Sequence, residues 1–239
     1  MQVISFGATD IGKVREANED AYLIDSSSRI FAVADGLGGL PGGAQASNRT
    51  IELLQLYSLS PSPENSGTQD LVDTISRIDE MVTREGDEAY PFTGMGSTLS
   101  LARIFEDQLQ IAHVGDSAIF LIREALIKKL TTDHTLAQNA VDEQGESIRA
   151  SLPPSYADTL TNCIGLESRV PTDTGRHQLQ TGDRVLLCTD GLSKYVSEEK
   201  LLTTITNNPA PENAVKQLIQ LAMQSGGSDN ITAIVIALN

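Results

Sequence analysis

Residues 97–124 read STLSLARIFEDQLQIAHVGDSAIFLIRE and contain three apolar runs separated by two very short links. Each run is rich in Val, Ile, Leu and Thr and partly alternates apolar with polar residues, which is typical of β-strands. The links EDQ and GDS are as short as the turns that join neighbouring antiparallel strands. We therefore predict an antiparallel meander over 97–131, with strands at 97–105, 108–115 and 118–124.

Outward from this meander, the chain alternates between further strand-like runs and pairs of helices. Additional strands are predicted at 3–9, 21–25, 29–35, 183–190 and 230–238. Apolar residues at helical spacing predict helices at 43–58, 69–85, 197–206 and 211–224. Segment 58–68 is expected to be an exposed loop and the polar segment 139–158 an irregular surface insertion. Residues 1–239 are therefore predicted to form one α+β domain, with antiparallel sheets and helices in separate layers.

Composition and charge narrow the class of function. The 239 residues carry a formal net charge of −15, which argues against nucleic acid or an anionic membrane as a partner. The charge serves solubility, or else some carboxylates converge on cations. There is no signal-peptide pattern and no apolar run long enough to cross a membrane. The two cysteines, Cys163 and Cys188, lie in apolar segments, so no disulfide framework is expected and the cytoplasm is the simplest compartment.

Acidic residues recur where predicted strands begin or end. The stretches FAVADGL and LLCTDGL each place an Asp-Gly pair after a buried strand, and other carboxylates stand in turns or just before a strand. The set comprises Glu19, Asp20, Asp35, Asp116, Asp190 and Asp229. Asp and Gly favour turns, and that explanation suffices for each position alone. Together they predict a shared rim where short carboxylates could bind a hard cation such as Mg²⁺ or Mn²⁺.

The glycine-rich stretch FAVADGLGGLPGG, residues 31–43, also suggests a nucleotide-binding loop, but its spacing does not fit one. A dinucleotide fingerprint starting at Gly36 would require a third glycine where Pro41 stands. A Walker A loop ending at Gly43 would require Lys next, and the chain continues with Ala44. The aspartate is therefore the more informative residue of this stretch.

Seven motifs follow one another along the chain: RxxNED, ADGxGG, GxGST, HVGDS, TxDH, CTDG and GGSDNIT. In this order the series resembles the metal-dependent Ser/Thr protein phosphatases of the PPM family (type 2C), in their compact bacterial form. The resemblance extends over residues 7–238. It implies a four-layer αββα sandwich, in which two antiparallel β-sheets pack face to face with helix pairs on the outside. It also implies that segment 139–158 corresponds to the variable flap beside the active site.

The resemblance further implies a centre of two Mn²⁺ or Mg²⁺ ions. Asp35 matches the carboxylate that bridges both ions, and Asp190 and Asp229 match the remaining ligands of one. The Gly36 carbonyl and the pair Glu19 and Asp20 match the side of the other. Asp116, together with Asp190, stands where family members bind a third, weaker ion.

Hydrolysis of phosphoserine or phosphothreonine in proteins would then follow from attack by a hydroxide that bridges the two ions. Arg15 is expected to hold phosphate oxygens with its planar guanidinium. The implied partners are phosphorylated proteins, in opposition to a Ser/Thr kinase, and the protein is expected to act as a monomer.

The sequence departs from the family pattern where a histidine often follows the first Asp-Gly. Leu37 and Leu40 occupy those positions, so the general acid that would protonate the leaving group is not identified. Ala118 replaces the Arg of a usual GDSR. We interpret His134 as structural.

Two other functions are compatible with parts of the sequence. Cys163 and Arg169 have the C-x₅-R spacing of cysteine-dependent phosphatases, although Glu167 inside that loop would repel phosphate. EDTA should inactivate a metal enzyme and spare a thiol enzyme, and iodoacetamide should do the reverse. A non-catalytic PPM-fold regulator, a pseudophosphatase that binds a phosphoprotein, is the second alternative, and the leucines at 37 and 40 favour it.

Overall fold

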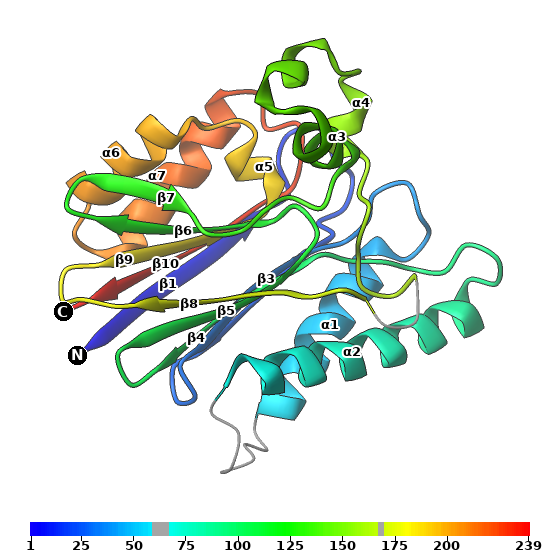
Figure 1. Ribbon diagram of the computed structural model, residues 1–239, viewed down its shortest axis with the longest axis horizontal. Helices are drawn as coiled ribbons and strands as arrows, with labels where there is room; N and C mark the ends of the chain where they lie inside the picture. The colour runs from blue at the N-terminus through cyan, green and yellow to red at the C-terminus, as the bar shows by residue number, and fades with distance from the viewer. Residues whose placement is uncertain (59–66, 167–169) are drawn as a thin grey trace.

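The computed structural model describes residues 1–58, 67–166 and 170–239 and consists of four layers (Figure 1). Two five-stranded sheets form the middle layers, and every pair of neighbouring strands is antiparallel. The first sheet has the order β1 (Val3–Asp10), β10 (Ile231–Leu238), β9 (Arg184–Cys188), β6 (Ala118–Arg123), β7 (Leu126–Lys129). The second has the order β2 (Asp20–Asp25), β3 (Ile30–Asp35), β4 (Leu99–Phe105), β5 (Gln108–Val114), β8 (Asp173–Gln178).

Helix pairs cover the outer faces of the sandwich (Figure 1). Helices α1 (Gly43–Ser58) and α2 (Thr68–Ala89) lie on the second sheet, and α6 (Glu198–Asn207) and α7 (Pro211–Gln224) lie on the first. The predicted αββα sandwich is therefore confirmed. A short helix, α5 (Asp190–Ser193), follows β9 directly. Within the described ranges no helix is both long and apolar enough to cross a membrane.

The central strands are apolar along their whole length because both of their faces are buried. In β3, Phe31 points into the core between the two sheets, whereas its neighbour Ala32 points into the core beneath α1 and α2. In β10, Ile234 belongs to the core between the sheets and Val235 to the core beneath α6 and α7. Side chains of a strand alternate between its faces, so a continuous apolar run fills two cores at once.

Strand register brings the acidic positions to one rim of the sandwich. In the second sheet, Asp20 at the start of β2 pairs with Asp35 at the end of β3. In the first sheet, β9 and β10 are antiparallel, so Asp190 follows the end of one strand beside the start of the other, where Asp229 lies. Because the two sheets pack face to face, these strand ends meet.

The predicted meander over 97–131 is wrong at its second turn. β4 pairs with β5 as expected, but β5 and β6 lie in different sheets, and β6 pairs with β7 and β9. The GDS segment therefore crosses between the sheets. Gly115 makes this possible, because it has φ +105° and a Cβ there would lie 2.6 Å from the Thr98 side chain. Since both strands are buried on both faces, their sequences do not distinguish a hairpin from a crossing.

Two further segments differ from the sequence prediction. The polar strand β8 at the edge of the second sheet was not predicted. Segment 136–158, expected to be irregular from 139 onward, folds into α3 (Leu136–Gln144), the 3₁₀ helix η1 (Glu146–Ser151) and α4 (Ser155–Asp158). We call residues 136–158 the cap. Most of the predicted loop 58–68 lies outside the described residues.

Candidate metal-binding active site

Asp35 stands at the centre of the rim, and the backbone around it is fixed by hydrogen bonds. Its N–H donates to Thr98 Oγ1 (3.0 Å), and its carbonyl accepts from the Thr98 N–H (2.8 Å) and Ser97 Oγ (2.9 Å). Burial, followed by repulsion from Asp20 and Asp190, raises the pKa of the Asp35 carboxyl well above its usual value. The backbone that carries this carboxylate is thus fixed in a place where the negative charge is costly without a cation.

Asp20 is buried and is held by two threonines from the first sheet. Its Oδ2 accepts hydrogen bonds from Thr189 Oγ1 (2.8 Å) and Thr232 Oγ1 (2.6 Å). Its Oδ1 is buried and finds no hydrogen-bond donor among the described residues, and the same is true of Asp190 Oδ1. Burial, which outweighs the threonine hydrogen bonds, raises the pKa of Asp20 to about 7. Two orphaned carboxylate oxygens therefore lie in the wall of the rim.

Arg15 lies over the rim and pairs with Asp229. Its Nε is 2.9 Å from Asp229 Oδ1 and its Nη2 is 2.9 Å from Oδ2, a two-pronged arrangement that raises the pKa of the guanidinium. The guanidinium also packs against Gly38, where a Cβ would lie 2.8 Å from Arg15 Nη1. One glycine of the 31–43 stretch thus leaves space for an arginine, not for a nucleotide.

Asn230 ties the N-terminal loop to the last strand. Its Nδ2 donates to the carbonyls of Ile11 (2.9 Å) and Ala17 (3.0 Å), and its Oδ1 accepts from the Glu19 N–H (2.8 Å). The Glu19 carbonyl in turn accepts from the Gly36 N–H (3.0 Å), so one chain of contacts leads from β10 to the first Asp-Gly turn. Sequence reasoning gave Asn230 no role, although it stands in the GGSDNIT motif.

A second close approach fixes the other Asp-Gly turn. A Cβ on Gly191 would lie 1.9 Å from the Asn230 carbonyl oxygen, so only glycine fits at this position. The turn that carries Asp190 therefore sits directly on the segment that carries Asp229.

Asp116, in the crossing between the sheets, is nearly buried, and burial together with Asp190 raises its pKa to about 6. Lys194, which sequence reasoning missed, faces it. The lysine Nζ lies 2.7 Å from Asp190 Oδ2, 2.9 Å from Asp158 Oδ1 and 3.3 Å from Asp116 Oδ2. Lysine four residues after Asp190 is a common helix pairing and gives no sequence signal of this contact.

The donor set fits hard divalent cations, because it consists of carboxylate oxygens with the Gly36 carbonyl beside them. The two orphaned buried oxygens, on Asp20 and Asp190, support this fit. In the described parts of the chain, no three His, Cys, Asp or Glu side chains already stand around one point as metal ligands. Two internal cations, Arg15 and Lys194, pair with carboxylates of the rim instead.

Two residues of the motif series, His134 and Ala118, make structural contacts. His134 accepts the Gly115 N–H at Nδ1 (3.1 Å) and donates its own backbone N–H to the Gly115 carbonyl (2.8 Å), so it fixes the crossing before Asp116. Ala118 is fully buried opposite Cys188 in the first sheet. Two residues of the alternative C-x₅-R motif, Glu167 and Arg169, lie outside the described residues.

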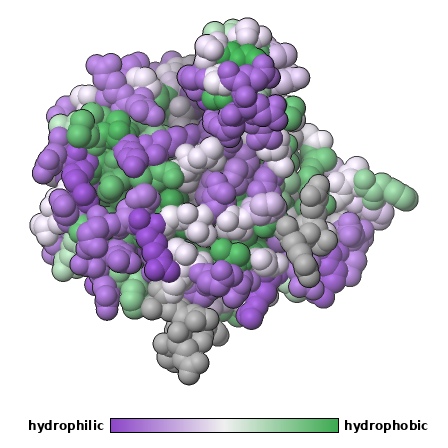
Figure 2. All heavy atoms as spheres, viewed as in Figure 1, coloured by the Kyte–Doolittle hydropathy of each residue, from purple (hydrophilic) through white to green (hydrophobic). Residues whose placement is uncertain are grey.

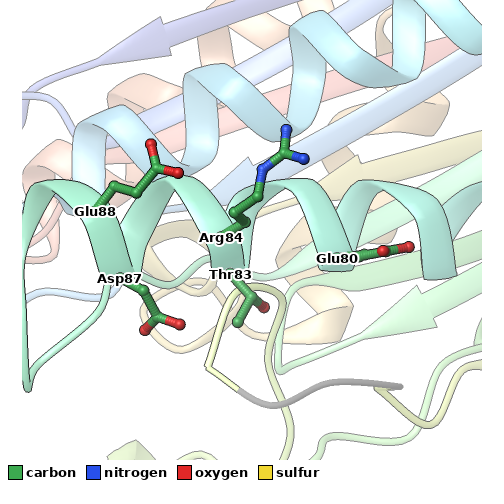
Figure 3. A pocket seen from close by; sticks show the side chains of 5 residues that line it. All are labelled: Glu80, Thr83, Arg84, Asp87 and Glu88. Atoms are coloured by element: carbon green, nitrogen blue, oxygen red, sulfur yellow. The ribbon is translucent and has the colours of Figure 1, made fainter.

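A hollow of about 340 Å³ lies along α2, away from the rim (Figure 3). Its five labelled lining residues, Glu80, Thr83, Arg84, Asp87 and Glu88, all come from this one helix. It contains none of the predicted site residues, so we base no function on it.

Comparison with known proteins gives the following similarities. A family model described as protein phosphatase 2C matches residues 12–222. The serine/threonine phosphatase stp of Listeria innocua is 29% identical, with 97% of this chain and 94% of that protein covered. PstP of Mycobacterium tuberculosis is 32% identical over 95% of this chain, which spans 43% of that protein.

Solved structures agree with these matches. The M. tuberculosis serine/threonine phosphatase PstP/Ppp superposes with a TM-score of 0.88 at 30% identity, covering 99% of both chains. The catalytic domain of PstP in complex with two manganese ions superposes with a TM-score of 0.84 at 29% identity, covering 99% of this chain and 98% of that one.

Proposed function

Because the chain belongs to the protein phosphatase 2C family, whose members are metal-dependent, we propose that the acidic rim is the active site of a serine/threonine protein phosphatase. The observation that carries this assignment is the meeting of Asp20, Asp35 and Asp190 from both sheets, two of them with an orphaned buried oxygen. A rim of like charges is stable at neutral pH when cations compensate it.

We assign two Mn²⁺ or Mg²⁺ ions to the rim. Asp35, central and flanked by the others, would contact both ions. Asp190 and Asp229 would complete the site on the first-sheet side, and Glu19, Asp20 and the Gly36 carbonyl would face the other ion. When bound, the two ions lower the pKa of water for attack on phosphorus and offset charge on the phosphoryl oxygens.

The chain's own residues supply positioning. Arg15 has two parallel N–H groups directed at Asp229, and the same fork fits two oxygens of a phosphate monoester. Thr189 and Thr232 hold Asp20 so that its second oxygen faces the rim. Leu37 and Leu40 carry no proton donor, so neither side chain can protonate the leaving serine or threonine oxygen.

The substrates are phosphoproteins made by serine/threonine kinases. With only two cysteines in 239 residues, the sequence offers no disulfide framework, which supports a reducing compartment such as the cytoplasm.

Release of phosphate from a phosphoserine peptide tests the assignment. Activity should require Mn²⁺ or Mg²⁺, disappear in excess EDTA and survive iodoacetamide. Asp35→Asn should lower kcat/KM at least a thousandfold. The matched control is Asp25→Asn, which changes a carboxylate at the far end of the same β2–β3 pair. Metal-dependent turnover that persists in Asp35→Asn would refute the assignment.

A further inference from the structure

Lys194 directs all three protons of its ammonium at carboxylates from three different segments. Asp190 belongs to α5, Asp116 to the crossing between β5 and β6, and Asp158 to α4 of the cap. Asp190 and Asp116 are 15% and 8% exposed, so the lysine head lies against the nearly buried wall of the rim. Asp158 is 70% exposed and lies on the outer side of the lysine.

We propose that Lys194 is a built-in cation that replaces a third metal ion and fastens the cap to the active site. The proposal rests on the proposed function, since it concerns the number of ions that the rim accepts. It differs from the expectation that Asp116 and Asp190 bind a third, weaker ion.

The space between Asp116 and Asp190 is already filled. A Mg²⁺ ion shared by these carboxylates would stand about 2.0–2.1 Å from their oxygens. The Lys194 nitrogen lies 2.7 Å from one and 3.3 Å from the other, so ion and ammonium would overlap and repel each other.

The cap has few other means of attachment. Within residues 136–158 only Ala137 and Val141 are buried. The cap stands out as a separate body at the top of Figure 2, with hydrophilic residues over much of its visible surface. Its N-terminal end is held by the Leu136 N–H, which donates to the Thr159 carbonyl (2.9 Å). Near its other end, the ion pair between Asp158 and Lys194 joins α4 to the sandwich.

The contacts of Lys194 have two consequences. Lys194 offsets one of the two negative charges of Asp116 and Asp190 with a side chain that cannot dissociate, so this part of the rim does not depend on metal concentration. The same side chain places α4 beside the rim, where phosphoprotein substrates must pass. Lys194 is therefore a positioning residue.

Counting bound ions tests the first half of the proposal. Calorimetric titration with Mn²⁺ should give two ions for the wild type and for Asp158→Asn. Lys194→Ala and Lys194→Asp should each accept a third ion, more tightly in the aspartate variant because it adds a carboxylate. Lys216→Ala is the matched control, because it removes a lysine that pairs with Glu212 on the surface of α7. Three ions in the wild type, or two in Lys194→Asp, would overturn the proposal. A wild type that binds none would refute the proposed function instead.

Hydrogen exchange of the Mn²⁺-loaded protein tests the second half. Amides within 136–158 should exchange at least fivefold faster in both Lys194→Ala and Asp158→Asn than in the wild type or Lys216→Ala. Asp158→Asn separates the two roles, since it releases the cap while Lys194 still faces Asp116 and Asp190. If the amides of the cap exchange as slowly in Asp158→Asn as in the wild type, the proposal that Lys194 fastens the cap is overturned.

Discussion

Without metal, the protein should lose stability as pH rises from about 4 to 7, and Asp20 should account for a large part of the loss. Burial moves the pKa of Asp20 from 3.8 to about 7 in the folded state. Between these values the folded protein holds a proton that the unfolded chain has released. The free energy of unfolding therefore falls with rising pH by about 1.4 kcal/mol per unit. Over about three units the contribution of Asp20 is on the order of 4 kcal/mol, fully present below pH 4 and lost above pH 7.

Asp20→Asn isolates this contribution. Asparagine keeps an acceptor for Thr189 and Thr232 but carries no charge. In EDTA the variant should match the wild type near pH 4 and exceed its stability by up to about 4 kcal/mol near pH 8. Urea unfolding at half-unit pH steps measures the difference.

A second carboxylate provides a control of opposite sign. Ser27 donates to Asp25 and lowers its pKa, so Asp25 stabilises the folded state above pH 4 and that stabilisation is lost as pH falls. Asp25→Asn should therefore be less stable than the wild type near pH 8. If Asp20→Asn gains no stability in EDTA at pH 8, or gains the same amount at every pH, the buried charge at the rim is not what destabilises the metal-free protein.

Three further outcomes are expected. Gly38→Ala should fold normally but raise KM for a phosphopeptide about tenfold, because the new Cβ displaces Arg15; an unchanged KM in steady-state assays would contradict the placement of the guanidinium. Asn230→Ala should destabilise the protein by about 3 kcal/mol in urea unfolding, since three partly buried hydrogen bonds are lost, and a loss under 1 kcal/mol would show that the loop is held elsewhere. Mn²⁺ at about 100 times its Kd should stabilise the wild type by about 2.7 kcal/mol per bound ion, and a melting scan at pH 8 without any shift would argue against a metal site.

The sandwich could be predicted largely from residue patterns because its central strands fill two cores. Continuous apolar runs predicted β3, β9 and β10 within a few residues, and apolar spacing predicted α1 and α7 with their observed bounds. Strand β8 was not visible, because most of its side chains are exposed and none is buried, so its only signal is the backbone pairing with β5. The crossing at Gly115 was equally hidden, since an apolar strand fits either sheet.

At the site, the sequence indicated which carboxylates converge but not what surrounds them. Asp20, Asp190, Asp116 and Asp229 all act electrostatically on Asp35, as their places at strand ends suggested. The role of Thr189 or Lys194 depends on distances between segments far apart in the chain, and no local pattern encodes those distances. Threonine and lysine are common in turns and helices, so neither residue indicates its role at the site before the sheets are assembled.

The pairing of β1 with β10 has a consequence for synthesis of the protein. Arg15 and Asp229 are 214 positions apart, and the loop that carries Arg15 is held in place by Asn230. A nascent chain that has exposed Asp20, Asp35, Asp116 and Asp190 still lacks the strand that closes the first sheet. Phosphatase activity should therefore appear only once β10 has left the ribosome, so a nascent chain that stops before β10 cannot remove phosphate from proteins near it.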